Sequence, residues 1–305
     1  MWVQRNGQEE PLPLPPRQYE WVRVSPDGNR VAIAIADDGT DIWISELARG
    51  TLSRLTEHPQ ADMTPIWTPD GQAVVFASNR DGTWGLYSRA ADGTGPVEQL
   101  ITIEDAEIPP APYGWSPDGQ SLVFEYRVGD SSSVDIGVIS MSDPPTWEPL
   151  LASDAEEGAP AISPDGRWIA YHSDQTGRRE IYLQRFPELG ERQQVSTGRG
   201  MDPVWTSDGR ALFYRSGPLG PPGEMSIVAI DTEPSVTIGT SELLFEKQYY
   251  RTPASTRRFD RSSNDQCLLM IDADALAGQS YGPAANQIIF VQNFFEELKA
   301  RVPIP

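Results

Sequence analysis

Short runs of alternating apolar and polar residues, each followed by a turn signal, recur along the whole chain. The stretch SPDGRWIAYHSDQTGRREIYL, residues 163–183, holds one full example: a turn tetrapeptide, an alternating run, a second turn with glycine, and another alternating run. Alternation with a period of two is typical of strands with one buried face, and short runs between Gly and Pro signals predict antiparallel strands. The pattern therefore predicts an all-β protein.

The turn tetrapeptide is the most regular part of an internal repeat. It reads SPDG at Ser25, Ser116 and Ser163, TPDG at Thr68, and TSDG at Thr206. Successive copies lie about 40 to 50 residues apart, and each is followed by three further strand-like runs. A degraded sixth copy occupies residues 262–265. Four short antiparallel strands per unit of this length are the signature of a propeller blade.

The composition of the tetrapeptide indicates a structural role. Ser or Thr bonds to the backbone ahead of it, Pro presets φ at the first turn position, and Gly supplies the left-handed conformation. The Asp could act as a ligand, but its repetition at the same turn of five units favours a turn residue.

These observations predict a six-bladed β-propeller of four-stranded antiparallel blades, with seven blades as the less favoured count. We expect one domain spanning residues 1–305, closed by strands from both ends of the chain, and a short helix at 294–301. The predicted blades cover residues 20–57, 61–101, 110–152, 157–198 and 201–246, and a last blade combines 256–293 with 1–14.

The formal net charge of −20 limits the classes of partner that the protein can bind. A field of this sign repels phosphate backbones, so we expect no nucleic-acid binding. No apolar run approaches the roughly 20 residues needed to span a bilayer, and MWVQRNGQEE lacks the features of a signal peptide. We therefore expect a soluble monomer without membrane insertion and without a cofactor. The compartment stays open, as does the possibility that the chain is part of a longer protein.

The repeats resemble a known family. The segments PIWTPDGQAVVFASNRDG and PAISPDGRWIAYHSDQTGRREIYL resemble the WD-like propeller repeats of the TolB type. WVQRNGQEEPLPLPPRQYEWVRVSPDG, DIWISELARGTLSRLT and NFFEELKARVPIP are similar to propeller regions found downstream of bacterial serine/threonine kinases. This resemblance implies a six-bladed, less often seven-bladed, platform that acts through protein contacts, in relatives that are often periplasmic or extracytoplasmic. Ser207 departs from the expected Pro, and no kinase motif is present.

Candidate catalytic residues are few. Residues 278–282, GQSYG, match the GxSxG nucleophile motif, which requires a following helix and a later histidine. The next residues predict a strand, and the two histidines, His58 and His172, precede Ser280. We expect His172 to pack within a strand and His58 to lie on a loop. We therefore assign no catalytic and no metal-ligating residue, and we expect a protein that is not an enzyme.

The best candidate site is the mouth of the central channel. Loops that lead from one blade into the first strand of the next converge there and carry several charged residues. Converging carboxylates would make a negative mouth for a cation or a basic peptide end, whereas the alternative is that these are ordinary loop residues. The candidate binding residues are Glu20, Asp62, Glu107, Tyr113, Glu157, Arg199, Asp202 and Arg257.

The leading hypothesis is a non-catalytic binding, scaffold or sensor propeller whose channel-mouth loops engage a protein or small-molecule ligand. Two alternatives stay open. One is a lyase or hydrolase with a metal at the central channel. The other is the regulatory domain of a serine/threonine kinase whose catalytic part is absent. The repeats themselves do not identify the ligand, because the function of a propeller lies in its loops.

Overall fold

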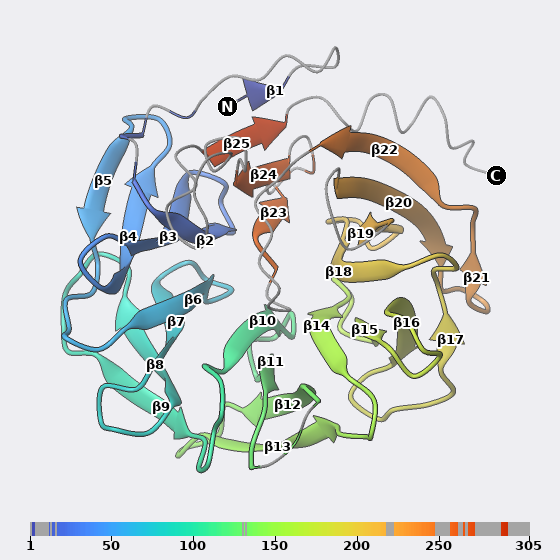
Figure 1. The fold of residues 1–305 in the computed structure, drawn as a ribbon, viewed down its shortest axis with the longest axis horizontal. Helices are drawn as coiled ribbons and strands as arrows, with labels where there is room; N and C mark the ends of the chain where they lie inside the picture. The colour runs from blue at the N-terminus through green and yellow to red at the C-terminus, as the bar shows by residue number, and fades with distance from the viewer. Residues whose placement is uncertain are drawn as a thin grey trace.

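The protein is a ring of small β-sheets, as Figure 1 shows. The computed structural model describes residues 2–3, 12, 14–15, 17–129, 131, 133–217, 223–247, 257–261, 265, 268–271 and 288–291. The innermost strands are β2, β6, β10, β14, β18 and β23, and the sheets extend outward from them. The predicted all-β propeller fold is therefore confirmed.

Five sheets are built from consecutive segments of the chain and are antiparallel throughout. The first contains β2 (Tyr19–Val24), β3 (Arg30–Ala36), β4 (Thr40–Glu46) and β5 (Thr51–Arg54). The second contains β6 (Asp62–Trp67), β7 (Ala73–Ser78), β8 (Gly85–Ala90) and β9 (Glu98–Thr102). The third contains β10 (Ala111–Trp115), β11 (Ser121–Tyr126), β12 (Asp135–Ser140) and β13 (Thr146–Leu151).

The fourth and fifth blades follow the same order with one departure. The fourth contains β14 (Glu157–Ile162), β15 (Trp168–Ser173), β16 (Glu180–Arg185) and β17 (Gln193–Gln194). The fifth contains β18 (Gly200–Trp205), β19 (Ala211–Ser216), β20 (Gly223–Asp231), β21 (Thr237–Ile238) and β22 (Glu242–Lys247). It has five strands instead of the predicted four, because β21 and β22 pair with different parts of the long β20.

The remaining sheet joins the two ends of the chain. Its order is β1-β25-β24-β23, where β1 is Trp2–Val3, β23 is Phe259–Arg261, β24 is Leu268–Ile271 and β25 is Ile288–Val291. Strands from both ends therefore share a sheet, as predicted, but β1 runs parallel to β25. The described chain thus holds five antiparallel blades instead of the predicted six, four of them with the predicted four strands, and one mixed sheet that contains strands from both ends of the chain.

Apolar side chains fill the spaces between neighbouring sheets. Between the first two blades, Trp21 and Ile42 pack with Trp67 and Phe76. Similar clusters join the second blade to the third, the third to the fourth and the fourth to the fifth. The mixed sheet packs on the fifth blade and on the first, so the apolar contacts run around the ring. Burying one such side chain stabilises the fold by about 1.5 to 3 kcal/mol, so these interfaces hold the ring together.

The repeated tetrapeptide forms the turn between the first two strands of each blade. In the fourth blade, the Ser163 hydroxyl donates to Asp165 Oδ1 at 2.5 Å, the Gly166 amide donates to the Ser163 carbonyl at 2.8 Å, and Gly166 has a φ of 73°. The same bonds recur in the first blade, from Ser25 to Asp27. The prediction that Asp and Gly serve the turn is confirmed.

Each of these turns also contacts the turn of the preceding blade. A methyl group placed on Gly166 would lie 3.0 Å from the Pro117 ring, and one on Gly209 would lie 3.4 Å from the Pro164 ring. Gly71 faces Pro26 in the same way, at 3.6 Å. The tetrapeptides therefore form a series of Gly–Pro contacts, which we call the turn series, that fixes the position of each blade against the previous one.

The turn series changes where the fifth blade meets the mixed sheet. Ser207 stands in place of the proline, and its amide donates to Asp265 Oδ2 at 2.6 Å while its hydroxyl donates to the same oxygen. The other carboxylate oxygen of Asp265 accepts from Arg261 Nη1 at 2.9 Å. The departure from the repeat at Ser207 therefore replaces an apolar turn contact with polar bonds to a buried carboxylate.

Removing the charge of Asp265 should weaken this contact. Asp265→Asn keeps the size of the side chain and tolerates the positive φ of 55° at this position. It is expected to lower the free energy of unfolding by about 2 kcal/mol, because hydrogen bonds to a charged group contribute about 1.5 to 3 kcal/mol. Chemical denaturation of the purified protein measures this. The exposed Asp92→Asn is the control, and equal stability of the two variants would contradict the role of Asp265.

Several predicted features lie outside the described residues. They are the C-terminal helix at 294–301, the GQSYG segment and most of the N-terminal and C-terminal parts of the last predicted blade. Among the described residues, no helix has the length and apolar character required to cross a membrane.

Candidate functional site

The first strand of each antiparallel blade contains an irregularity that turns its backbone near the ring axis. The pairing register with the second strand shifts in β2, β6, β10, β14 and β18. At three of these shifts a residue other than glycine has a positive φ: Thr64 at 50°, Ala159 at 50° and Asp202 at 55°. A bulge of this kind redirects the adjacent side chains, and bulges often occur next to functional sites.

Side chains from opposite parts of the ring meet where these strands converge. The Arg257 amide, two residues before β23, donates to the Tyr113 hydroxyl of the third blade at 3.1 Å. Arg23 of the first blade donates from Nη1 to the Arg257 carbonyl, also at 3.1 Å. All three residues are buried. We call the group at this position the axial cluster; its members are Arg23, Tyr113, Glu125, Asp202, Arg257 and Asp260.

Glu125 is a buried carboxyl group within the axial cluster. Its Oε1 accepts a hydrogen bond from the Ala159 amide of the fourth blade at 2.5 Å. Burial, reinforced by the nearby Asp202 and Glu156, raises the pKa of Glu125 from 4.5 to about 8 despite this bond. Burial likewise raises the pKa of Tyr113 well above its usual value of 10. A pKa in this range favours the protonated form of the Glu125 carboxyl at neutral pH.

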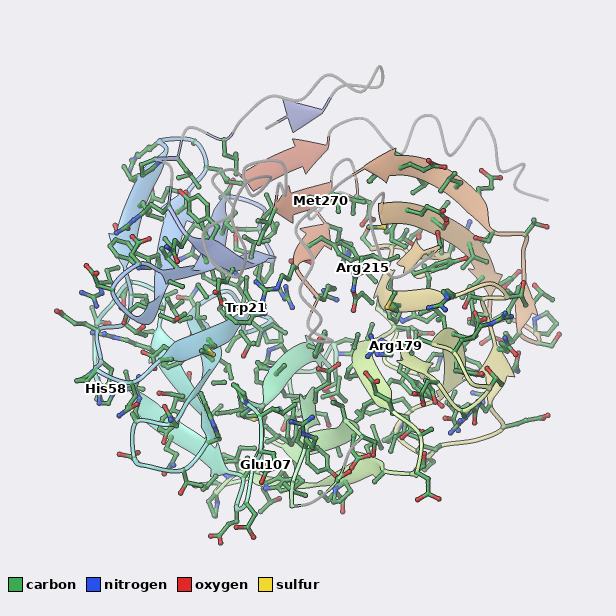
Figure 2. The ribbon with its side chains drawn as sticks, in the orientation of Figure 1. Trp21, His58, Glu107, Arg179, Arg215 and Met270 are labelled. Carbon is green, nitrogen blue, oxygen red and sulfur yellow. The ribbon has the colours of Figure 1, made fainter. Side chains whose placement is uncertain are left out.

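Two ion pairs border the axial cluster. Arg215 Nε donates to Asp202, and Arg179 Nη2 donates to both carboxylate oxygens of Glu156 at 2.6 and 2.8 Å. Figure 2 shows Arg179 and Arg215 close to the centre of the ring. Burial acts to raise the pKa of Glu156, but His172 and Arg179 outweigh it and lower that pKa to about 2. Both ion pairs therefore lie beside the buried carboxyl group of Glu125.

His172 is fully buried beside the same cluster. Its Nε2 lies 3.8 Å from Glu156 Oε1, and neither ring nitrogen has a hydrogen-bond partner among the residues that the structure describes. Gly158 separates His172 from Glu125: a methyl group there would lie 2.6 Å from Glu125 Oε1 and 2.7 Å from His172 Nε2. The absence of a side chain at Gly158 therefore lets the two titratable groups approach.

Glu125, His172 and Arg215 occupy the same position of successive repeats. Each stands nine residues after the Ser or Thr of its tetrapeptide, where the first two blades carry Ala34 and Ala77. A polar residue on the inner part of a buried second strand is unusual, since such positions are otherwise apolar. Aligning the repeats on their tetrapeptides would therefore have pointed to Glu125, His172 and Arg215 as site residues from the sequence alone.

Three of the predicted site residues belong to the axial cluster, and a fourth lies beside it. Tyr113, Asp202 and Arg257 interact directly or electrostatically with Arg23. Glu20 is near Arg258, whose Nη1 donates to the Glu20 carbonyl at 2.8 Å, and burial raises the pKa of the Glu20 carboxyl. Residues from separate blades are thus brought together as the hypothesis of a channel site requires.

The other four predicted residues are not part of this cluster. Asp62 is buried and bonded by Arg80 Nη2 at 2.8 and 3.0 Å, and Glu157 is buried with Oε1 bonded by Ser153 at 2.7 Å. Arg199 donates its amide to Glu180. Glu107 is exposed and lies away from the centre of the ring in Figure 2. These four residues therefore do not form an open ring of acidic side chains. Ligand binding by the predicted residues stays a prediction.

The sequence interpretation missed Arg23, Glu125 and Asp260. Arg23 and Asp260 lie inside inner strands instead of in the loops that precede them. The part of the chain that the structure describes contains no group of three or more His, Cys, Asp or Glu side chains arranged to hold a metal ion.

Comparison with known proteins places this geometry among propellers. The family model described as the TolB beta propeller domain matches residues 21–143. An uncharacterized peptidase, YuxL of Bacillus subtilis, is 26% identical over 200 residues, covering 50% of this chain and 29% of the peptidase. The Tol-Pal system protein TolB of Francisella tularensis is 27% identical over 158 residues, covering 50% of this chain and 35% of TolB. The match thus spans only about a third of each relative's length.

A solved structure shows the same fold over most of the chain. The oligogalacturonate lyase from Vibrio parahaemolyticus superimposes with a TM-score of 0.59 at 14% identity, and the match covers 90% of each chain. At this identity the similarity concerns the fold alone.

Proposed function

We propose, from the premise that the chain is a TolB-like β-propeller, that it is a binding module that docks a partner at the mouth of its central channel. The observation that supports this function is the axial cluster, where polar side chains from separate sheets meet instead of apolar ones. Buried polar groups with unmatched atoms destabilise a fold, so their presence at the axis favours a functional reason over a structural one. The two ion pairs beside them offer partly exposed charges to a partner.

The face that carries Glu156 and Arg179 is the expected docking surface. Their side chains are 19% and 22% exposed, so both groups can reach a partner without unfolding of the blade. The charges on this face are already paired with each other, unlike those of the predicted acidic mouth. A partner that offers both hydrogen-bond donors and acceptors would therefore fit it best. A regulatory role beside a kinase domain stays a prediction.

Neutralising this pair should weaken partner binding. In the double variant Arg179→Met/Glu156→Gln, neither a cation nor a carboxylate is left unpaired, so the fold should be retained. A partner captured from an extract of the source cells and then purified should bind this variant about tenfold more weakly, as expected for loss of a charge-assisted contact. Isothermal titration calorimetry with the purified partner measures the affinity.

The matched control is Arg49→Met/Glu46→Gln, which removes an exposed pair with a separation of 3.2 Å and the same charges. It should bind the partner as the unmodified protein does. Equal affinity of both double variants would contradict docking at the channel mouth.

The second candidate function is an enzyme. It is favoured by the buried His172, which lies close to Glu156, by a relative described as an uncharacterized peptidase and by a structure of the same fold described as an oligogalacturonate lyase. Carboxyl groups with displaced pKa values, as at Glu125 and Glu156, are typical of catalytic sites. Turnover of oligogalacturonate or of a peptide substrate that is lost in His172→Asn would favour this function over the first. Stable binding of a partner without any product would favour the binding module.

A further inference from the structure

We propose, on the premise of the binding function above, that the axial cluster is a carboxylate site in which Arg23 and Arg257 bind the carboxylate of a peptide end or a small organic acid. Arg23 lies in β2 of the first blade, and Arg257 lies two residues before β23 of the mixed sheet. Two carbonyl groups hold Nη1 of Arg23 in place.

Both guanidinium groups have hydrogen-bonding capacity that the protein leaves unused. Arg23 and Arg257 are 4% and 5% exposed, and the Nε of each has no hydrogen-bond partner within the described residues. The bonds of Arg23 Nη1 go to neutral carbonyls, those of Val22 at 2.8 Å and Arg257 at 3.1 Å. A buried donor without an acceptor is costly, at about 1 to 3 kcal/mol, so an acceptor supplied from outside would stabilise this arrangement.

The neighbouring carboxylates do not hydrogen-bond to the Nε atoms of these arginines. Asp202 accepts from Arg215 instead. Asp260 accepts from the Val24 amide at 2.9 Å, and its other oxygen forms an ion pair with Arg257 Nη2 at 3.7 Å, which is too long for a hydrogen bond. Burial and the charge of Arg257 lower the pKa of Arg23 to about 10, which is still well above neutral pH. Arg23 therefore stays charged and lies close enough to Arg257 for the two groups to repel each other.

The balance of charge favours an anion with a single charge. The formal charges of Arg23, Arg215 and Arg257 exceed those of Asp202 and Asp260 by one, and burial raises the pKa of Glu125 to about 8. One carboxylate would balance the surplus, whereas a phosphate dianion would exceed it. The planar carboxylate also matches the geometry of guanidinium donors better than a cation or a neutral group does.

Charged groups beside the cluster are partly exposed. The side chains of Arg215 and Asp260 are 18% and 14% exposed, and Arg179 lies nearby with 22%. Figure 2 shows Arg179 and Arg215 on neighbouring parts of the inner ring. Their positive charges would guide an anion toward the axis of a protein whose overall charge of −20 would otherwise repel it.

Titration of the ¹⁵N-labelled protein with sodium acetate tests the site. The Nε–Hε signals of Arg23 and Arg257, assigned from their absence in Arg23→Met and Arg257→Met, should shift together and reach saturation. By calorimetry, Arg23→Met/Arg257→Met should bind acetate at least about tenfold more weakly, because it lacks both charged donors. Arg49→Met/Arg185→Met, which removes two exposed arginines, is the matched control and should bind acetate normally.

Trialanine with a free carboxylate and trialanine amide distinguish the two sources of the ligand. Tighter binding of the free acid than of acetate indicates a peptide end, and equal binding indicates a small acid. Equal binding of the amide, or binding of inorganic phosphate as tight as that of acetate, would overturn a carboxylate site. The carboxylate site would also be overturned if acetate left the Nε–Hε signals of Arg23 and Arg257 unchanged in the unmodified protein. This result does not depend on whether the double variant folds.

The two proposals can fail separately. If acetate leaves both arginine signals unchanged while Arg179→Met/Glu156→Gln still weakens partner binding, the docking function stands and the carboxylate site is wrong. If acetate binds but Arg179→Met/Glu156→Gln binds the partner as the unmodified protein does, the docking function is wrong and the carboxylate site stands.

Discussion

Gly158→Ala is expected to lower the free energy of unfolding by about 3 kcal/mol, because overpacking a buried site typically costs about 1 to 3 kcal/mol and a hydrogen bond is lost as well. The new methyl group would lie 2.6 Å from Glu125 Oε1 and 2.7 Å from His172 Nε2. Neither group can move easily, since Glu125 is held by the Ala159 amide and His172 is fully buried. Urea denaturation followed by tryptophan fluorescence measures the change.

Gly114→Ala is the matched control for this substitution. Gly114 also lies in a first strand, but a methyl group there would be 3.5 Å from the nearest atom, the Ile162 nitrogen, which is an ordinary contact. It should cost less than about 1 kcal/mol, the usual range for a change without a steric clash. If the two variants were equally stable, the close packing of Glu125 and His172 around Gly158 would be contradicted.

The stability of the protein should fall as the pH rises from about 5 to 8.5, and Glu125→Gln should reduce this fall by a few kcal/mol. The pKa of Glu125 is raised from 4.5 to about 8 in the folded state, so the folded state binds its proton more tightly than the unfolded state does. The resulting contribution is complete below the unfolded pKa and is lost as the pH rises through about 8. Each pKa unit corresponds to about 1.4 kcal/mol.

Glutamine mimics the protonated carboxyl at every pH, so the variant should gain most over the unmodified protein at pH 8.5. Burial also raises the pKa of Asp135, to about 6, but the resulting change in stability is largely complete below pH 7. The slope between pH 7 and 8.5 therefore reports on Glu125. Denaturation curves across this range measure it, with the exposed Glu98→Gln as the control. A slope unchanged in Glu125→Gln would show that Glu125 is ionised at neutral pH.

The repeat made the blades predictable because its information is local. The turn of Ser163 and Gly166 depends on bonds within six residues, and the alternation after it sets which face is buried. The pairing of β1 with β25 was also expected, but the parallel direction of β1 was not. Neither strand carries a turn signal that fixes its direction, so the wider assembly of the chain decides it.

The site was predicted only in part because contacts across the axis are not local. Tyr113 and Arg257 were expected near the channel, and they contact each other over 144 positions of sequence. Asp62 was expected in the mouth, yet an arginine of its own blade, Arg80, binds it within the protein. Sequence places a charged residue on a strand, but it does not say whether a neighbour neutralises it. That pairing determines which charges remain for a ligand.

The turn series gives the ring a property that single blades do not have. Because Gly71, Gly166 and Gly209 meet the preceding blade through the same kind of contact, the turn contact does not distinguish one pair of these blades from another. The apolar clusters between the blades differ from pair to pair, so they decide which blades fit together. The bond from Ser207 to Asp265 has no equivalent among the described turns, so it distinguishes the interface between the fifth blade and the mixed sheet from the others. The ring therefore combines one spacing device that all these blades share with interfaces that are specific to each pair.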